Sequence, residues 1–196
     1  GSGKSLTLKA ILNLLSSSLE VKKNISSDFE LSFDTIGFIP QNPFTSLSSM
    51  TKIKNQIFCS DEKKEEVFKL LDLPLEILEK YPSQISGGQT QRVVIAIALS
   101  RDIKLLLLDE PTTALDFENK TNIINIINDL KDKLNINILF VTHDIESIKD
   151  ICDDIVIIKN GYVVEFGKTQ EVLNNPQNEY TKKLLNSSFK NKKFRN

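Results

Sequence analysis

The stretch SGGQTQRVVIAIALSRDIKLLLLDEPTTALD, from Ser86 to Asp116, decides the fold of this chain. Ser86 and Gln89 have the spacing of a capping box, so we expect a helix to begin between them. Helix formation does not explain Gly87 and Gly88, because a glycine inside a helix costs about 1 kcal/mol relative to alanine. Two backbone amides without side chains at a helix N-terminus do let an anion come close, which predicts a phosphate-binding turn.

Two carboxylates follow a run of four leucines. Leu105 to Leu108 is apolar at every position, which is typical of a parallel strand covered on both faces. The strand ends on Asp109 and Glu110, and ligands bind at the carboxyl ends of strands in open α/β sheets. The alternative is that either carboxylate only caps a turn. An adjacent acidic pair directly before Pro111 favours ligand binding.

Three motifs, ISGGQ, LLLLDEP and TTALD, together resemble the ATP-binding subunit of an ABC transporter. The resemblance covers nearly the whole chain. It implies an α/β fold: a P-loop NTPase core with a mainly parallel sheet, an inserted small helical subdomain and an antiparallel hairpin near the C-terminus. It assigns these roles: Ser86, Gly87, Gly88 and Gln89 as the signature motif, Asp109 as the Walker B acid, Glu110 as the catalytic glutamate and Asp116 as the D-loop aspartate.

The first residues match the end of a phosphate-binding loop. Gly1 to Ser5, GSGKS, fits the last five positions of the pattern GxxxxGK[ST], so we expect the chain to begin inside this Walker A motif. A leader left from cloning is the alternative, but the apolar face of a helix follows, at Leu8, Ile11, Leu12 and Leu15. The expected phosphate-binding residues are Gly1, Ser2, Gly3, Lys4 and Ser5. Lys4 would neutralise the β- and γ-phosphates, and the Ser5 hydroxyl would bind Mg²⁺. The resemblance places an adenine-stacking aromatic residue upstream.

Two further residues complete the expected catalytic set. The short strand Ile36 to Ile39 follows an alternating stretch, Phe29 to Phe33, and leads to Gln41. The resemblance makes Gln41 the Q-loop residue, which contacts Mg²⁺ and the attacking water. The next buried strand after the carboxylates, Ile138 to Val141, brings His143 to the same edge of a parallel sheet. A lone histidine is usually a bystander, but the resemblance makes His143 the H-loop residue that contacts the γ-phosphate.

The remaining segments predict the organisation of one domain. Ser60 can cap a helix, and Pro74 suits the first position of another that ends near Pro82. Apolar residues at Ile123, Ile127, Leu130 and Leu134 predict a helix with one buried stripe. Asn160-Gly161 predicts a hairpin that extends the sheet at its far edge. By resemblance, the catalytic core is 1–41 and 90–173, the helical subdomain with the signature is 42–89, and the C-terminal tail is 174–196.

Composition excludes some function classes. The formal net charge of −1 gives no field for gathering nucleic acid. No apolar run approaches the ~20 residues needed to cross a bilayer, so other chains would cross any membrane. Cys59 and Cys152 stand apart and are expected to be free thiols in a reducing compartment.

The resemblance implies a mechanism and partners. Two ATPase subunits, identical or different, would form a head-to-tail dimer in which the signature of one closes over ATP and Mg²⁺ held by the other. Glu110 would activate water, and Asp109 would hold Mg²⁺ through water. The tail from Asn174 to Leu185, with QNPFTSL and YPSQISGG, is similar to importers of oligopeptides, dipeptides or nickel. The implied partners are permease subunits and, indirectly, a substrate-binding protein, at the cytoplasmic face of the inner membrane.

Three alternatives stay open at this point: an ABC ATPase of DNA repair or of the ribosome, a regulatory subunit that binds nucleotide without hydrolysing it, and an inactive fragment. The first usually needs an insertion or a second cassette, and this chain has room for neither. Glu110, Gln41 and His143 argue against the second, because degeneration usually strikes these positions. A comparison of ATP binding with a longer version of the protein would test the third.

Overall fold

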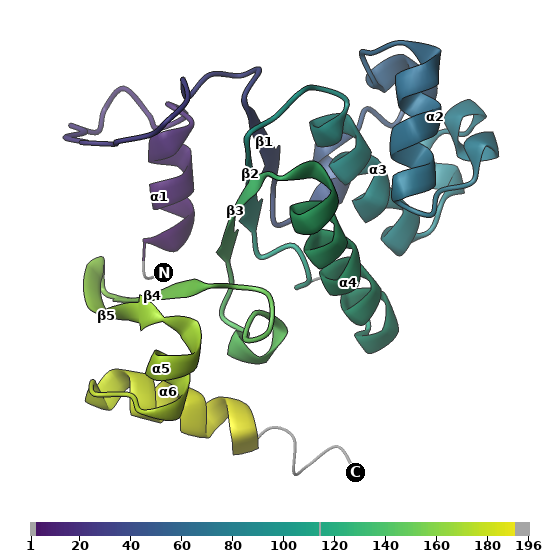
Figure 1. The fold of residues 1–196 in the computed structure, drawn as a ribbon. Coiled ribbons are helices and arrows are strands. Elements are labelled where there is room, and N and C mark those ends of the chain that lie inside the picture. Colours follow the sequence, from purple (N-terminus) through teal and green to yellow (C-terminus); the bar gives the residue numbers. More distant parts are fainter. Residues whose placement is uncertain (1–2, 114, 191–196) are drawn as a thin grey trace. The chain divides into compact units, whose positions relative to one another are not determined.

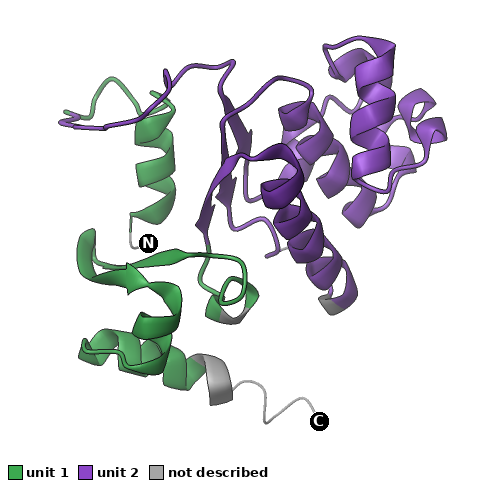
Figure 2. Cartoon of the chain, in the orientation of Figure 1, with its two compact units in different colours: residues 1–20, 142–196 green, residues 21–141 purple. Residues whose placement is uncertain are grey.

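The computed structural model describes residues 3–113 and 115–190 (Figure 1). It divides into two compact units, which Figure 2 shows in separate colours. Residues 1–20 and 142–196 form the first unit, and residues 21–141 form the second. The division of the chain at residues 42, 90 and 174, expected from the resemblance, stays a prediction.

A parallel sheet organises the second unit. Its strands are β1 (Ile36–Ile39), β2 (Leu105–Asp109) and β3 (Asn137–Val141), in the order β1-β2-β3 (Figure 1). Leu106, Leu107 and Leu108 of the central strand are completely buried, as the unbroken apolar run predicts. The mainly parallel sheet and its central strand are therefore confirmed.

One helix precedes the central strand β2 in the sequence, and another follows it. The helix α3 (Gly87–Leu99) begins at Ser86 and buries almost every residue of its middle turns. The helix α4 (Phe117–Leu134) buries a stripe at Ile123, Ile127 and Leu130. This spacing puts the three side chains on one face, so the predicted amphipathic helix is confirmed.

The segment between β1 and α3 is helical but mostly in short turns. The helix α2 (Asp61–Leu70) begins where predicted, because the Ser60 side chain accepts a hydrogen bond from the backbone of Lys63. The 3₁₀ turns are η1 (Pro43–Ser46), η2 (Ile53–Gln56), η3 (Leu75–Glu79) and η4 (Pro82–Gln84).

The helix expected from Pro74 to Pro82 is wrong. Only the 3₁₀ turn η3 forms there, and the backbone of Tyr81 is extended. A proline disfavours the helical conformation of the residue before it, so Pro82 ends the turn. The backbone carbonyl of Lys80 instead accepts a hydrogen bond from Ile53, at 3.0 Å.

The alternating stretch Phe29 to Phe33 forms no strand. The reason is a contact from a distant part of the sequence. The Arg101 guanidinium stacks 4.0 Å from the centre of the Phe33 ring and donates hydrogen bonds to the carbonyls of Phe33 and Ile36. The Phe33 carbonyl, which a partner strand would otherwise use, is thereby satisfied by a side chain.

The first unit begins with the helix α1 (Lys4–Ile11), which buries Leu8. Asn13 has a left-handed backbone, with φ of 58°, so Leu15 of the predicted apolar face lies beyond the helix. After the short turn η5 (Ile145–Ser147) come β4 (Asp154–Lys159), β5 (Tyr162–Lys168), α5 (Thr169–Asn174) and α6 (Glu179–Lys190).

The hairpin of β4 and β5 is confirmed, and its expected place at the far edge of the parallel sheet stays a prediction. Asn160 and Gly161 have φ of 50° and 82°, as a primed turn requires. The two strands pair with each other and with no other described strand. On β4, Ile155 and Ile157 are buried and Val156 is exposed, which is the alternation of an antiparallel strand with one covered face.

The sequence predicts neither a membrane-spanning helix nor a disulfide, and the described residues bear on each. No described helix is long and apolar enough to cross a membrane. Neither Cys59 nor Cys152 forms a disulfide, and each is partly buried.

Candidate functional site

Three of the predicted site residues meet at one edge of the parallel sheet. In the strand register Ile39 lies opposite Leu108, so Gln41, two residues beyond β1, leaves the sheet at the edge where Asp109 ends β2. Asp109 is 6% exposed, Glu110 is half-buried and Gln41 is exposed. The sheet thus delivers a buried carboxylate, a second carboxylate and an amide to its carboxyl end, where ligands bind in such folds.

Glu110 has an unusual backbone. Its φ is 48°, in the left-handed region that a residue with a side chain seldom adopts. This conformation costs about 1–3 kcal/mol and persists where neighbouring contacts enforce it, often at functional sites. Here the amide of Glu110 donates to the carbonyl of Val141 at 2.8 Å, and its own carbonyl accepts from the amide of Thr113 at 3.2 Å.

The Glu110 carboxylate also has a fixed direction. The Thr113 hydroxyl donates a hydrogen bond to its Oε2 at 3.0 Å. The sequence does not predict this contact, because nothing in the motif TTALD indicates which of its two threonines reaches the carboxylate. Thr113 is therefore a functional candidate that only the structure reveals.

The turn before α3 has the predicted capping box. The amide of Gln89 donates to the Ser86 hydroxyl at 3.2 Å, and the Gln89 side chain accepts from the amide of Ser86 at 3.0 Å. At Gly87 an added Cβ would lie 3.6 Å from the Phe44 ring, which is an ordinary contact. Nothing in the packing of this residue requires a glycine, so the anion-binding interpretation fits it best.

At position 88, packing also explains why the residue is a glycine. This glycine is buried, and an added Cβ would lie only 2.5 Å from Oδ1 of Asn119. Any side chain at position 88 must displace the Asn119 amide. The sequence does not show this contact, because Gly88 and Asn119 lie on different helices.

Asp116 begins α4. Its Oδ1 accepts from the backbone amide of Asn119 at 2.9 Å, and its Oδ2 accepts from Nδ2 of the same residue at 2.8 Å. These two bonds, first the backbone one and then the side-chain one, hold the pKa of Asp116 below its ordinary value. Both oxygens of the Asp116 carboxylate are thus engaged by one asparagine, and its role as a D-loop aspartate stays a prediction.

The first unit holds the other predicted residues. Gly3 lies just before α1 with φ of 90°, a conformation that favours glycine, and its carbonyl accepts from the amide of Thr7 at 3.0 Å. Lys4 and Ser5 form the first turn of α1 and are half-buried. His143 follows β3 by two residues and is exposed. Gly1 and Ser2 lie outside the described residues.

The structure therefore groups the predicted residues in two sets. The second unit contains Gln41, Ser86, Gly87, Gly88, Gln89, Asp109, Glu110 and Asp116. The first unit contains Lys4, Ser5 and His143. The convergence of these two sets on one ligand stays a prediction.

The predicted metal ligands suit magnesium. The Ser5 hydroxyl, the Gln41 amide oxygen and the Asp109 carboxylate are all hard oxygen donors, and Mg²⁺ usually binds one or two carboxylates together with substrate phosphates. Within the described ranges, no cluster of three or more His, Cys, Asp or Glu offers a competing metal site. The buried position of Asp109 at the sheet edge fits the proposed role.

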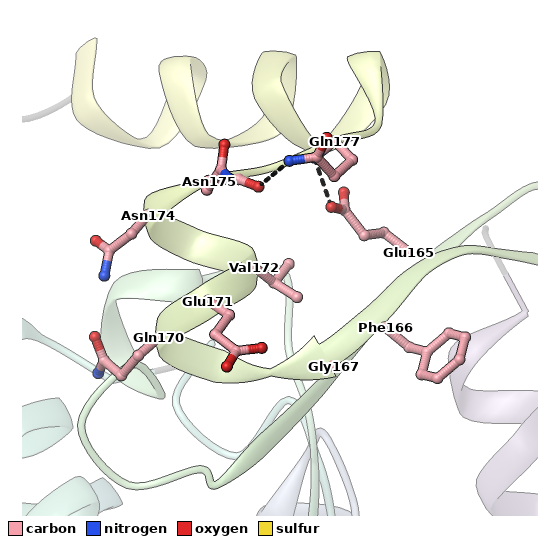
Figure 3. A pocket seen from close by; sticks show the side chains of 9 residues that line it. All are labelled: Glu165, Phe166, Gly167, Gln170, Glu171, Val172, Asn174, Asn175 and Gln177. Atoms are coloured by element: carbon pink, nitrogen blue, oxygen red, sulfur yellow. Dashed lines mark hydrogen bonds between the residues drawn. The ribbon is translucent and has the colours of Figure 1, made fainter.

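A cavity of about 610 Å³ lies between β5, α5 and the loop before α6 (Figure 3). Its charged lining residues are Glu165 and Glu171, and the Glu165 carboxylate accepts hydrogen bonds from the amides of Gln177 at 2.7 Å and Asn178 at 3.2 Å. Glu165 therefore holds the loop before α6 in place. No predicted site residue lines this cavity.

Comparison with known proteins gives matches in sequence and in fold. A family model described as "ABC transporter" matches residues 1–113. The oligopeptide transport ATP-binding protein OppD of Lactococcus lactis subsp. cremoris (strain SK11) is 31% identical, over 96% of this chain and 64% of its own length. The methionine import ATP-binding protein MetN of Streptococcus pneumoniae (strain R6) is 35% identical, over 96% of this chain and 59% of its own. The chain thus spans about six tenths of the length of these relatives.

Solved structures share the fold. The cbiO1 protein of Clostridium perfringens, described as part of the ABC transporter complex cbiONQ, gives a TM-score of 0.72 at 26% identity, over 89% of this chain and 76% of its own. The ATP-binding cassette MJ0796, described as a dimer bound to ADP and Pi, gives 0.65 at 27% identity, over 86% and 81%. These likenesses confirm the predicted α/β P-loop NTPase fold. Because the family model covers more than half of the chain, the chain belongs to the ABC transporter family.

Proposed function

We propose that this chain is the ATP-hydrolysing part of an ABC importer. The observation that carries the proposal is the Asp109-Glu110 pair at the carboxyl end of a buried parallel strand. Glu110 is held there in a left-handed conformation, with its carboxylate bound to Thr113. Strain at an acidic residue fits a position selected for its chemistry.

Each proposed catalytic residue has one task. Glu110 accepts a proton from the attacking water, and Gln41 orients that water. The backbone amides of residues 1–5 and the Lys4 ammonium hold the β- and γ-phosphates. His143 donates a hydrogen bond to the γ-phosphate, where charge develops during transfer. Mg²⁺, when bound by Ser5, Gln41 and Asp109, supplies positive charge to the same oxygens.

A second copy completes the site in this proposal. The turn at Ser86 to Gln89 presents amides of a helix N-terminus to the γ-phosphate of ATP that the other copy binds. ATP then joins the two copies, and its hydrolysis removes the shared contact and lets them separate. The similarity to MJ0796, a cassette described as dimeric, supports this arrangement.

The proposed cargo is a peptide or amino acid. The names of relatives that cover most of this chain include oligopeptide, dipeptide and methionine importers, and these names favour such cargo over nickel. The chain would act as a peripheral subunit on permease subunits at the cytoplasmic membrane face and would meet a substrate-binding protein only through them. The motif QNPFTSL, which forms η1 in the structure, supports the peptide assignment.

Replacing Glu110 tests the proposal. In the full-length protein, Glu110→Gln should lower ATP turnover by about 10²–10⁴-fold, because the water loses its general base. ATP binding should persist, and sedimentation should show an ATP-dependent dimer. Glu118→Gln is the matched control, since Glu118 is an exposed glutamate in the first turn of α4.

The outcomes are distinct. A Glu110→Gln protein that hydrolyses ATP at the normal rate contradicts the assignment of the general base. A wild-type protein that binds ATP without hydrolysing it would be a regulatory subunit. Uptake of labelled oligopeptide and of labelled methionine by cells that lack the gene then decides between the two cargo classes.

A further inference from the structure

The signature turn and the D-loop aspartate are joined by one side chain, that of Asn119. Its Nδ2 donates to Oδ2 of Asp116 at 2.8 Å, and its backbone amide donates to Oδ1 of the same carboxylate. The opposite end of the amide, Oδ1, occupies the space beside Gly88 where a Cβ would stand. One planar group therefore touches both motifs and has no spare room on the side of Gly88.

The Asn119 amide leaves no room for a side chain at position 88. A Cβ on residue 88 would approach Oδ1 of Asn119 to 2.5 Å, closer than real Cβ atoms come to other atoms. The amide would have to rotate or withdraw, and either movement changes the geometry of its bond to Asp116. Conversely, the Cβ of Asn119 lies 3.8 Å from the same point, an ordinary contact. The interference thus comes from the amide group alone.

The loop on the other side of Asp116 leads back to Glu110. Among the described residues between them, the amide of Leu115 donates to the carbonyl of Thr112, and the amide of Thr113 donates to that of Glu110. The Thr113 hydroxyl also holds the Glu110 carboxylate. A shift of Asp116 therefore reaches the carboxylate through a short, hydrogen-bonded segment.

We propose that Asn119 is a positioning residue that couples the signature turn to the D-loop and Glu110 of the same chain. The inference rests on the proposed function. In that arrangement the signature turn contacts ATP on the second copy, whereas Glu110 acts on ATP held by its own chain. Asn119 thus makes the state of one ATP site felt at the other, and nucleotide contact at Gly88 adjusts the direction of Glu110.

Asn119→Ala tests the coupling, with Asn125→Ala as the matched control. Asn125 is an exposed asparagine on the same helix. We expect Asn119→Ala to lower turnover at saturating ATP about fivefold, as loss of one partly exposed hydrogen bond to a charged group would. The affinity for ATP, measured in the Glu110→Gln background, should stay within about twofold, and the Hill coefficient for ATP should fall toward one. A purely structural role of Asn119 would not lower turnover and the Hill coefficient while leaving the affinity for ATP unchanged.

A double-mutant cycle with Gly88→Ala makes the test sharper. Gly88→Ala should depress turnover in the presence of Asn119, but much less in the Asn119→Ala background, where the new methyl group meets no amide oxygen. The melting temperature should show the same non-additivity, which tests the steric contact independently of catalysis.

Three results overturn the inference. Losses that simply multiply across the cycle show that Gly88 and Asn119 act separately. An Asn119→Ala protein that matches Asn125→Ala in turnover and Hill coefficient shows that the amide positions nothing. Either result, obtained with an active wild-type protein, leaves the proposed function standing. A wild-type protein that hydrolyses no ATP, the third result, overturns the proposed function and the inference together.

Discussion

The hydroxyl of Thr113 offers the most direct control over the proposed general base. Thr113→Val replaces the hydroxyl by a methyl group of similar size and removes the 3.0 Å bond to Oε2 of Glu110. Thr113 is exposed, so the change leaves the core intact. A hydrogen bond to a charged, partly exposed group contributes about 1 kcal/mol. If that bond orients the carboxylate in the transition state, its loss slows turnover about fivefold, since 1.36 kcal/mol corresponds to tenfold.

The assay is steady-state ATP hydrolysis over a range of ATP concentrations. The account predicts a lower kcat with little change in KM, because the hydroxyl contacts the base and not the nucleotide. Thr113→Ser keeps the hydroxyl and should retain most of the activity. If Thr113→Val turns over at the wild-type rate, or if Thr113→Ser is equally impaired, the hydroxyl does not orient Glu110.

Two further predictions concern stability. Leu107→Ala should lower the free energy of unfolding by about 2–5 kcal/mol in urea denaturation, because this leucine is completely buried in the central strand; Leu75→Ala, at a residue 47% exposed, should cost far less, and equal losses would contradict the assigned core. The pKa of Asp116 is lowered by its bonds to Asn119, so its charged form stabilises the fold above the ordinary pKa of 3.8, and this stability is lost as the pH falls through the lowered value. The melting temperature of Asp116→Asn should therefore be below that of the wild type at pH 7 and converge on it in acid, and a gap that stays constant with pH would refute the charge effect.

Local chemistry makes much of the fold predictable. The capping box at Ser86 and Gln89, the unbroken leucines of β2 and the Asn160-Gly161 turn each depend on residues close in sequence. Their backbone conformations follow from hydrogen bonds and sterics within a few positions. For the same reason the order of strands and helices, and with it the edge where Asp109 leaves the sheet, can be inferred from the sequence.

What the sequence does not show depends on distant partners. The stretch Phe29 to Phe33 alternates like a strand, but Arg101 satisfies its last carbonyl from the end of α3. The packing role of Gly88 depends on Asn119, a residue of another helix. The left-handed backbone of Glu110 is likewise enforced by Val141 on the neighbouring strand. Such contacts are tertiary, and no local pattern in one sequence identifies them.

In the proposed mechanism the signature turn of one copy completes the nucleotide site of another. A mixture of two variants, each inactive by itself, tests this arrangement. Lys4→Ala removes the ammonium group that is proposed to hold the β- and γ-phosphates of ATP. Gly87→Asp places a negative charge at the signature turn, where the Cβ has room beside Phe44 and an acidic residue suits a helix N-terminus.

Each variant alone should hydrolyse almost no ATP. After unfolding and joint refolding, half of the dimers are mixed, and each mixed dimer has one site with both motifs intact. We expect ATP turnover in an equimolar mixture to rise well above that of either variant, up to about one quarter of the wild-type rate if the two sites work independently and less if they are coupled. A mixture that stays as inactive as its two components would contradict a site shared between copies.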